Sequence, residues 1–450
     1  MGKNITSEND FFGVEKISKI LLKIAPPVML AQLIQALYNI VDSFFVGKYS
    51  DNALTALSVV YPVQLIIVAL SVGMGVGVNT YMARKFARGK DDEANYTAGA
   101  GMVLAVIGWF VFAVVAYFIM TPYVNISAKS PDAINDAIVY GKIVCVGSIG
   151  AFLEGNWSKV HQAQGNMKLP IIAQIVGAAT NIILDPIFIF GAGIIPEMGV
   201  AGAAYATICG QIVAAIITGI KGYRIPPKIR DMLHYIKKIY FYGYPSILMQ
   251  ALFTIYIIAL NLILAGFSDS AVTVLGLYYK MQSFFFIPLF GLQTCVVPLL
   301  SYNYAKGNFE RCRETMKDAF IISASFMIIG IIMFVFFPKE VIGIFSSSNE
   351  VFEIGKIAFP IIGTCFFPAI FSLIMPVFFQ AIGYGKTSLL LSLIRQIFCL
   401  IPIFWGLSLI DLDYSWLAFP ISETIAGGIG LLLYTHLLHT WKLKFFGFKK

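Results

Sequence analysis

The residues of this sequence that could do chemistry are carboxylates and amides inside long apolar stretches. Asp42 lies in residues 25–48, a run long enough to cross a bilayer whose hydrocarbon core of about 30 Å needs roughly 20 apolar residues in a helix. A charge there costs at least about 2.5–3.5 kcal/mol, so it normally faces a protein interior or an aqueous cavity. Gln35 and Asn39 share its helical face and predict one polar stripe. The alternative places Asp42 at the helix end, with its carboxylate reaching the headgroups.

A second group of polar residues lies in the stretch NIILDP. Asn181 and Asp185 are four residues apart, so on a helix an amide oxygen and a carboxylate can approach the same ion. Pro186 follows and can free a backbone carbonyl as a further ligand or act as a hinge. The alternative is that Asp185 only accepts a hydrogen bond between helices. Thr207, in GAAYATICGQ, adds little alone, because threonine hydroxyls commonly bond back to their own helix.

Other ionisable residues inside apolar stretches have open roles. Glu154 either faces a cavity, where it would attract cations, or pairs with Lys142 or Lys159. Lys280 and Arg395 either pair with carbonyls, extend towards the headgroups or have a functional role.

The composition predicts an all-α membrane protein that crosses the bilayer many times. Of 450 residues, 58% are hydrophobic and only 12% are charged, and the mean hydropathy of +0.80 lies outside the range of soluble globular proteins. Twelve apolar stretches are long enough to span, at residues 24–46, 54–82, 96–121, 138–163, 169–190, 199–222, 240–266, 272–302, 318–337, 356–382, 387–410 and 415–441.

The distribution of basic residues predicts the topology. The net charge of +8 comes from lysines and arginines that gather at the N-terminus, in the even-numbered loops and in the C-terminal tail. This alternation is typical of bilayer topology and not of nucleic-acid binding, so no nucleic-acid partner is expected and both termini are predicted to be cytoplasmic. The six cysteines and four histidines form no metal-ligand pattern.

The chain contains two copies of one half. One constant offset, called here the repeat offset, aligns Pro27 with Pro245, Gly73 with Gly291, and the segment VHQAQGNMK with FFQAIGYGK. Each copy has six spans, and since six is even the copies are parallel, related by an axis along the membrane normal with a cavity at their seam. The basic segment KGYRIPPKIRDMLHYIKK links them. The predicted lobes are residues 1–225 and 226–450.

The two copies differ in their acids. The first holds Asp42, Glu154 and Asp185 inside spans, whereas the second holds Glu423 alone, and Leu260 stands at the position equivalent to Asp42. Carboxylate chemistry is therefore expected in the N-terminal half, and Glu423 is expected to bond within the C-terminal lobe.

The whole chain resembles the MATE family of multidrug and toxic-compound extrusion transporters, and within it the bacterial MepA-type branch. The resemblance rests on PPVMLAQLIQALYNIVDSFFVGKYSDNALTAL, QAQGNMKLP, NIILDPIFIFG and GVAGAAYAT in the first half and KMQSFFFIPLFGLQTCVVPLLSYNYAKGN in the second. It implies twelve helices in two six-helix lobes that alternate between outward-open and inward-open shapes. It also implies a bacterial cell membrane location and antiport of amphipathic cationic drugs, such as dyes, quaternary ammonium compounds or fluoroquinolones.

The resemblance also implies site residues. The ion site of relatives coupled through the N-terminal lobe falls here on Asp42, Asn181, Asp185 and Thr207. Lys280 fits the MepA-type pattern without an assigned role. Cavity neighbours implied by the family pattern are Gln35, Tyr140 and Asn156. Relatives coupled through the C-terminal lobe carry acids in the seventh and tenth spans, but this chain has none in residues 240–266 or 356–383.

The energy source is expected to be an ion gradient, because the sequence has no P-loop of the form GxxxxGK[ST]. No cofactor is expected beyond a coupling cation, Na+ or H+. An amide and a hydroxyl oxygen favour Na+, whereas a carboxylate pair alone would suit a proton. An enzymatic role has little support, and a monomer is expected. The alternatives are a flippase for lipid-linked oligosaccharides, which should have a cavity rich in Arg and Lys, and an ion channel.

Overall fold

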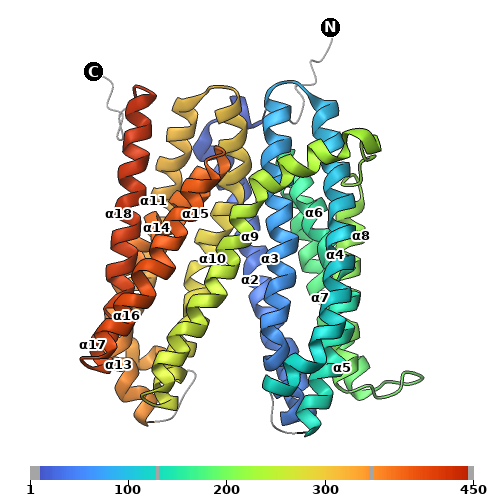
Figure 1. Ribbon diagram of the computed structural model, residues 1–450, viewed down its shortest axis with the longest axis vertical. Coiled ribbons are helices and arrows are strands. Elements are labelled where there is room, and N and C mark those ends of the chain that lie inside the picture. The colour runs from blue at the N-terminus through green and yellow to red at the C-terminus, as the bar shows by residue number, and fades with distance from the viewer. Residues whose placement is uncertain (1–10, 128–130, 344–348, 444–450) are drawn as a thin grey trace. The chain divides into compact units, whose positions relative to one another are not determined.

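The protein is helical throughout the part of the chain that the computed structural model describes, residues 11–127, 131–343 and 349–443 (Figure 1). The only bridge between extended residues in these ranges pairs Ala192 with Ile195. Within the described ranges, ten helices are long and apolar enough to cross a bilayer, and two bent helix pairs pass the same test together, which gives up to twelve spans. This confirms the predicted all-α polytopic architecture.

The chain divides into two compact units. Among the described residues, the first unit is Phe11 with Leu30–Ile247, and the second is Phe12–Met29 together with the sequence from Leu248 onwards. The lobes predicted from the repeat, residues 1–225 and 226–450, divide the sequence differently and stay a prediction. Two long helices contribute to both units, α2 (Ile17–Tyr49) and α9 (Ile229–Ala265).

Six helices lie wholly in the first unit, and α7 and α8 pack against each other within it. The six are α3 (Asp51–Ala87), α4 (Asp91–Ser127), α5 (Pro131–Gly147), α6 (Ile149–Ala163), α7 (Lys168–Phe190) and α8 (Val200–Gly219).

The second unit holds the remaining long helices and several short ones, preceded by the four-residue α1 (Phe11–Val14) at the start of the described chain. They are α10 (Asp269–Ala305), α11 (Phe309–Phe336), α12 (Pro338–Gly343), α13 (Asn349–Gly363), α14 (Phe366–Ala381), α15 (Gly385–Leu393), the π-helix η2 (Ile394–Leu400), α16 (Ile401–Ser408), α17 (Leu412–Ser415) and α18 (Ala418–Thr440).

Two predicted spans are bent where the sequence pattern predicts one continuous helix. The chain turns by 42° between α5 and α6 and by 56° between α13 and α14. At both breaks a side-chain hydroxyl bonds to a nearby carbonyl: Ser148 Oγ donates to the Cys145 carbonyl at 2.8 Å, and Thr364 Oγ donates to the Ile361 carbonyl at 2.7 Å. Such local bonds compete with the helical ladder and permit a bend.

The units fill their cores differently. In the first unit, small residues let helices approach: a Cβ on Gly75 of α3 would lie 2.7 Å from the Gly155 carbonyl oxygen of α6. In the second unit, aromatic rings fill the space, with Phe334 and Phe359 stacked at 4.9 Å between ring centroids and Phe286 meeting Phe366 edge-on at 5.0 Å.

Candidate functional site

Helices α7 and α8 approach closely because glycines face each other. A Cβ on Gly210 would lie 2.6 Å from the Gly177 carbonyl oxygen, and a Cβ on Gly177 would lie 2.9 Å from the Gly210 carbonyl oxygen. No larger residue fits either position without moving a backbone. Asn181 follows Gly177 by one helical turn and Thr207 precedes Gly210 by about one turn, so this contact places the two polar side chains opposite each other.

The polar side chains of α7 and α8 form a buried hydrogen-bonded group. Asn181 Nδ2 donates to Asp185 Oδ1 at 3.3 Å and to Thr207 Oγ1 at 3.4 Å. Asp185 is fully buried, and Asn181 and Thr207 expose 2% and 7% of their surface. The amide N–H groups of Asn181 are therefore used within the protein, which fixes the direction in which its carbonyl oxygen points.

Asp42 joins this group from the C-terminal half of α2, which belongs to the same unit. Only 9% of Asp42 is exposed, so it lies inside the unit and not at an exposed helix end. Its carboxyl group is an electrostatic neighbour of the Asp185 carboxyl group. Two carboxylates this near would repel each other unless a cation or proton lay with them.

Three buried oxygen atoms in this group have no hydrogen-bond donor. They are Asp42 Oδ1, Asn181 Oδ1 and Asp185 Oδ2. Buried acceptors are rarely left without a partner, because water or a protein donor normally satisfies them. Carboxylate and amide oxygens are the ligands that hard cations prefer. The arrangement can therefore take up a hard cation or, at the carboxylates, protons.

Pro186 follows Asp185 within α7. Because proline has no backbone N–H, the helical hydrogen bond to the carbonyl four residues earlier, that of Ile182, cannot form. This weak point of the helix lies next to the acidic pair, as the sequence predicts.

The other predicted residues of the first unit make their described contacts elsewhere. Tyr140 is buried on α5, and its hydroxyl accepts from Gln64 Nε2 at 3.1 Å. Glu154 of α6 accepts from Ser158 Oγ at 2.5 Å. Whether it faces a cavity or pairs with Lys142 or Lys159 stays a prediction.

Asn156 is buried where α6 crosses α4, and its Oδ1 lies 2.5 Å from the position that a Cβ on Gly101 would occupy. Gln35 is half-buried on α2. The side chains of Asn39 and Lys280 lie outside the described residues, so the predicted polar stripe of α2 and the role of Lys280 stay predictions.

A second buried charged group lies in the second unit, and sequence reasoning did not foresee its pairing. Arg395 on η2 and Glu423 on α18 are 8% and 7% exposed, and Arg395 Nε lies 3.5 Å from Glu423 Oε1. Ser372 of α14 donates a hydrogen bond to the same carboxylate. The prediction that Glu423 bonds within the C-terminal lobe is confirmed. The π-helix at Arg395 could not be inferred from hydrophobic periodicity.

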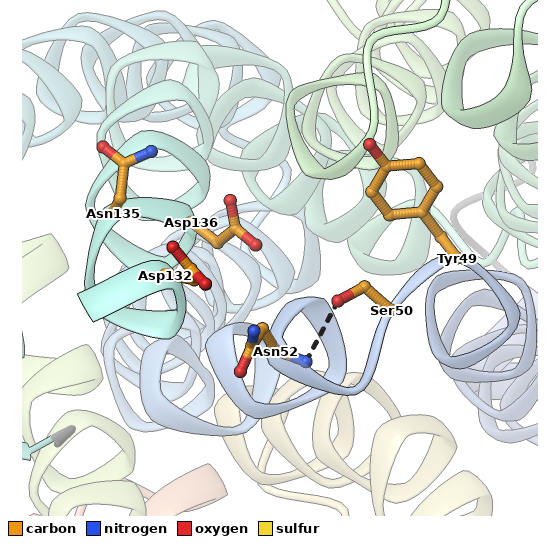
Figure 2. A pocket seen from close by; sticks show the side chains of 6 residues that line it. All are labelled: Tyr49, Ser50, Asn52, Asp132, Asn135 and Asp136. Carbon is orange, nitrogen blue, oxygen red and sulfur yellow. Dashed lines mark hydrogen bonds between the residues drawn. The ribbon is translucent and has the colours of Figure 1, made fainter. Parts of the chain in front are cut away.

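A solvent-facing pocket of about 480 Å³ opens where α2 ends and where α3 and α5 begin (Figure 2). Ser50 Oγ accepts from the Asn52 backbone N–H at 3.1 Å and so caps α3. Asp42 does not line this pocket, so the pocket is separate from the buried polar group. Its lining residues are Tyr49, Ser50, Asn52, Asp132, Asn135 and Asp136.

Comparison with known families gives two matches within this chain. The family model described as MatE matches residues 27–187 and again residues 245–405. The second match begins and ends one repeat offset after the first. This is the same offset that aligns Pro27 with Pro245. The two halves are therefore copies of one family unit.

Curated relatives and solved structures agree with this assignment. The chain is 30% identical over 373 residues to a probable multidrug resistance protein NorM of Thermotoga maritima, covering 78% of this chain and 77% of that one. It is 23% identical over 433 residues to the multidrug export protein MepA of Staphylococcus haemolyticus, covering 94% of each chain. The outward-facing structure of a multidrug resistance MATE family transporter matches with a TM-score of 0.89 at 22% identity, over 97% of this chain and 99% of that chain.

Proposed function

This chain belongs to the MatE family, and we propose that it is a secondary active antiporter that exports amphipathic organic cations in exchange for Na+ or H+. It would act by alternating access, as a monomer in a bacterial cell membrane, with both termini in the cytoplasm. The names of the NorM and MepA relatives support multidrug export, and the repeat of six spans supports two lobes that move against each other.

The observation that carries the coupling proposal is the set of three buried oxygens without donors. Asp42, Asn181 and Asp185 supply one each, from two helices of one unit. A cation at this point would satisfy all three acceptors and remove the repulsion between the two carboxylates. A proton shared between Asp42 and Asp185 would remove the repulsion but would leave the amide oxygen without a partner. This difference favours Na+, with H+ able to compete.

In this proposal Thr207 and Asn181 have separate tasks. Thr207 Oγ1 accepts from the Asn181 amide, and Asp185 accepts from the same amide nitrogen. These two bonds hold the Asn181 carbonyl oxygen where it can contact the ion. Thr207 is then mainly a positioning residue for that amide. The remaining lone pair of its Oγ1 could also contact the ion.

Ion binding must also change the arrangement that holds the drug. The ion would bridge α2 and α7, because Asp42 comes from the first helix and Asp185 from the second. Pulling these helices together would disfavour the drug-holding arrangement of the first unit, and the drug would leave on the outer side. The carrier then returns to the inward-open shape with the ion bound, and the ion leaves to the cytoplasm.

The proposal can be tested with ethidium efflux from proteoliposomes of known orientation. A Na+ gradient and a pH gradient are imposed separately on wild-type protein and on Asp42→Asn. The matched control is Asp91→Asn, which removes an exposed carboxylate at the start of α4. We expect one gradient to drive uphill efflux, the Asp42→Asn variant to lose it, and the control to keep it.

Three outcomes would decide against the proposal. Efflux that neither gradient drives in a folded sample would exclude antiport and make lipid-linked substrates the next test. Full coupling in Asp42→Asn would place the ion site elsewhere. Ion current without fixed stoichiometry would indicate a channel.

A further inference from the structure

The segment between α8 and α9 is not helical, yet it is held firmly on the first unit. Arg224 donates through Nε to Asn95 Oδ1 of α4 at 2.8 Å and through Nη1 to the Lys221 carbonyl at 2.6 Å. A Cβ on Gly99 of α4 would lie 2.5 Å from the Ile225 carbonyl oxygen, so the segment touches α4 backbone to backbone. These contacts fix which of its side chains face outward.

The first part of α9 crosses α3 and is fixed to the same unit (Figure 1). Tyr242 stacks on Tyr81 of α3 at 5.8 Å between ring centroids. A Cβ on Gly77 of α3 would lie 2.1 Å from the Ile239 carbonyl oxygen, so these two helices also touch backbone to backbone. Tyr235 and Ile239 are buried. They define the side of α9 that points into the protein, and the exposed residues occupy the rest of its circumference.

Helix α9 is too long to lie entirely within the hydrocarbon core of a bilayer. It has 37 residues, which at a rise of 1.5 Å per residue gives a length of about 55 Å. The hydrocarbon core is only about 30 Å thick. The span predicted from the sequence begins at residue 240, so residues 229–239 precede it. These residues, and the segment before them, therefore belong at the level of the lipid headgroups.

Large apolar side chains are exposed along this part of the chain. Ile225, Ile229 and Leu233 expose 73%, 92% and 59% of their surface. Successive residues of a helix are rotated by about 100°, so Leu233 lies only about 40° from Ile229 around α9, and the exposed Tyr240 lies between them. A row of exposed apolar residues marks a surface that another molecule or the membrane covers.

Basic side chains border this apolar row. By the same rotation, Lys237 and Arg230 lie about 80° and 100° from Ile229, on the side away from the buried residues of α9. Both are exposed, and neither forms an ion pair among the described contacts. Further exposed lysines of this stretch are Lys221, Lys228 and Lys238. An apolar row bordered by cations is the pattern of a helix that lies in the bilayer interface, with its apolar side at the acyl chains and its cations at anionic headgroups.

The charge of the stretch selects the kind of lipid. Residues 221–239 contain six lysines and arginines and one acid, Asp231. Asp231 lies about 160° from Ile229 around α9, on the side opposite the apolar row. A zwitterionic lipid would cover the apolar row but would not balance the cations. A soluble acidic partner would balance the cations but would leave the apolar row without acyl chains. An anionic phospholipid matches both.

We propose that residues 221–240, called here the linker surface, are a docking surface for anionic phospholipids. Ile229 and Leu233 enter the boundary of the acyl chains, and Arg230 and Lys237 bind the phosphate groups of the lipids. In the predicted topology these lipids belong to the cytoplasmic leaflet. Because Arg224 and the backbone contacts hold the linker surface on the first unit, the bound lipids fix the depth of that unit in the bilayer. This proposal does not depend on antiport.

The experiment measures which lipids lie beside the linker surface in a bilayer. The full-length protein carries an environment-sensitive fluorophore on Leu233→Cys, with the partly exposed Cys209 and Cys399 replaced by alanine. It is reconstituted into phosphatidylcholine liposomes that contain a fixed small fraction of brominated phosphatidylglycerol or, in parallel, of brominated phosphatidylcholine. Bromine atoms on the acyl chains quench the fluorophore only where it lies close to them, so the ratio of the two quenching values reports the preference for the anionic lipid.

Two double variants are compared in this labelled background. Arg230→Gln with Lys237→Gln removes the two cations that border the apolar row. The matched control, Arg88→Gln with Lys317→Gln, removes two exposed charges outside the linker surface. Equal quenching by brominated phosphatidylcholine in all three proteins shows that each is inserted in the same way.

We expect both lipids to quench the fluorophore, and phosphatidylglycerol to do so about two- to fivefold more strongly, because one basic residue near an anionic surface contributes about a fivefold preference. The Arg230/Lys237 variant should lose this preference, the control should keep it, and high salt should reduce it. Absence of quenching by either lipid would overturn the proposal, since the linker surface would then face water or a soluble partner. Equal quenching by the two lipids, or an equal loss of preference in the control, would also overturn it. No transport is measured, so these outcomes are separate from a failure of the antiport proposal.

Discussion

The contact between α7 and α8 can be tested by filling it with a single methyl group. In Gly210→Ala the new Cβ would lie 2.6 Å from the Gly177 carbonyl oxygen and 3.2 Å from the Asn181 Cβ. Carbon and oxygen atoms approach to about 3.3–3.6 Å even in favourable contacts, so the helices must separate by about 0.7 Å or more. The atom in the way is backbone and not the flexible end of a side chain, so α7 itself must move.

This separation acts directly on the candidate ion site. The bond from Asn181 Nδ2 to Thr207 Oγ1 is 3.4 Å long, already at the end of the usual range, so a further shift would break it. A typical hydrogen bond contributes about 0.5–1.5 kcal/mol net, and its loss would free the Asn181 amide to rotate. If the amide oxygen binds Na+, this energy corresponds to an affinity about two- to tenfold weaker.

The assay is the Na+ concentration that gives half-maximal ethidium efflux from proteoliposomes, with thermal unfolding as a check on folding. The matched control is Gly428→Ala on α18, where a Cβ meets no atom within 4 Å and which lies in the other unit. We expect Gly210→Ala to raise the required Na+ concentration and Gly428→Ala to leave it unchanged. A folded Gly210→Ala protein with the wild-type Na+ requirement would refute the reasoning that this contact positions the site.

Three further predictions follow from the same contacts. Thr207→Val should raise the Na+ concentration for half-maximal efflux about two- to tenfold, because Asn181 loses an acceptor. Thr207→Ser keeps the hydroxyl and should leave this concentration unchanged. An equal rise in both variants would contradict the role given to the Thr207 hydroxyl. Arg395→Met should lower the free energy of unfolding by about 3–5 kcal/mol, because Glu423 is left buried without its cation. The double variant Arg395→Met with Glu423→Gln should recover much of that loss. No recovery would mean that the loss comes from packing and not from charge. The Na+ concentration for half-maximal efflux should rise as the pH falls, because protons and Na+ neutralise the same two carboxylates, and a requirement independent of pH would exclude this competition.

The fold was predictable from the sequence because a bilayer allows few solutions. Apolar stretches of sufficient length must be helices, since the hydrocarbon core offers no partners for an open backbone, and the internal repeat assigns six to each half. The proximity of Asn181 and Asp185 followed from helical spacing within one stretch. Their proximity to Thr207 and Asp42 depends on how three helices pack, which the resemblance to a family supplied; the Gly177–Gly210 contact explains the part that concerns Thr207.

The features that were missed arise from packing between distant segments. The pairing of Arg395 with Glu423 depends on the rotation of two helices, and the π-helix at Arg395 shifts that rotation by an amount that no periodicity records. The bends at Ser148 and Thr364 depend on which of many hydroxyl groups bonds to a local carbonyl.

The two copies share a scaffold but differ at the positions that would hold an ion. The repeat offset carries Asp42, Asn181, Asp185 and Thr207 onto Leu260, Cys399, Ile403 and Ile425, which offer no oxygen ligand from their side chains.

In the second unit, the buried acid Glu423 lies beside Arg395, so the protein itself balances its charge. The first unit, in contrast, holds two neighbouring carboxyl groups with no basic residue paired to either among the described contacts.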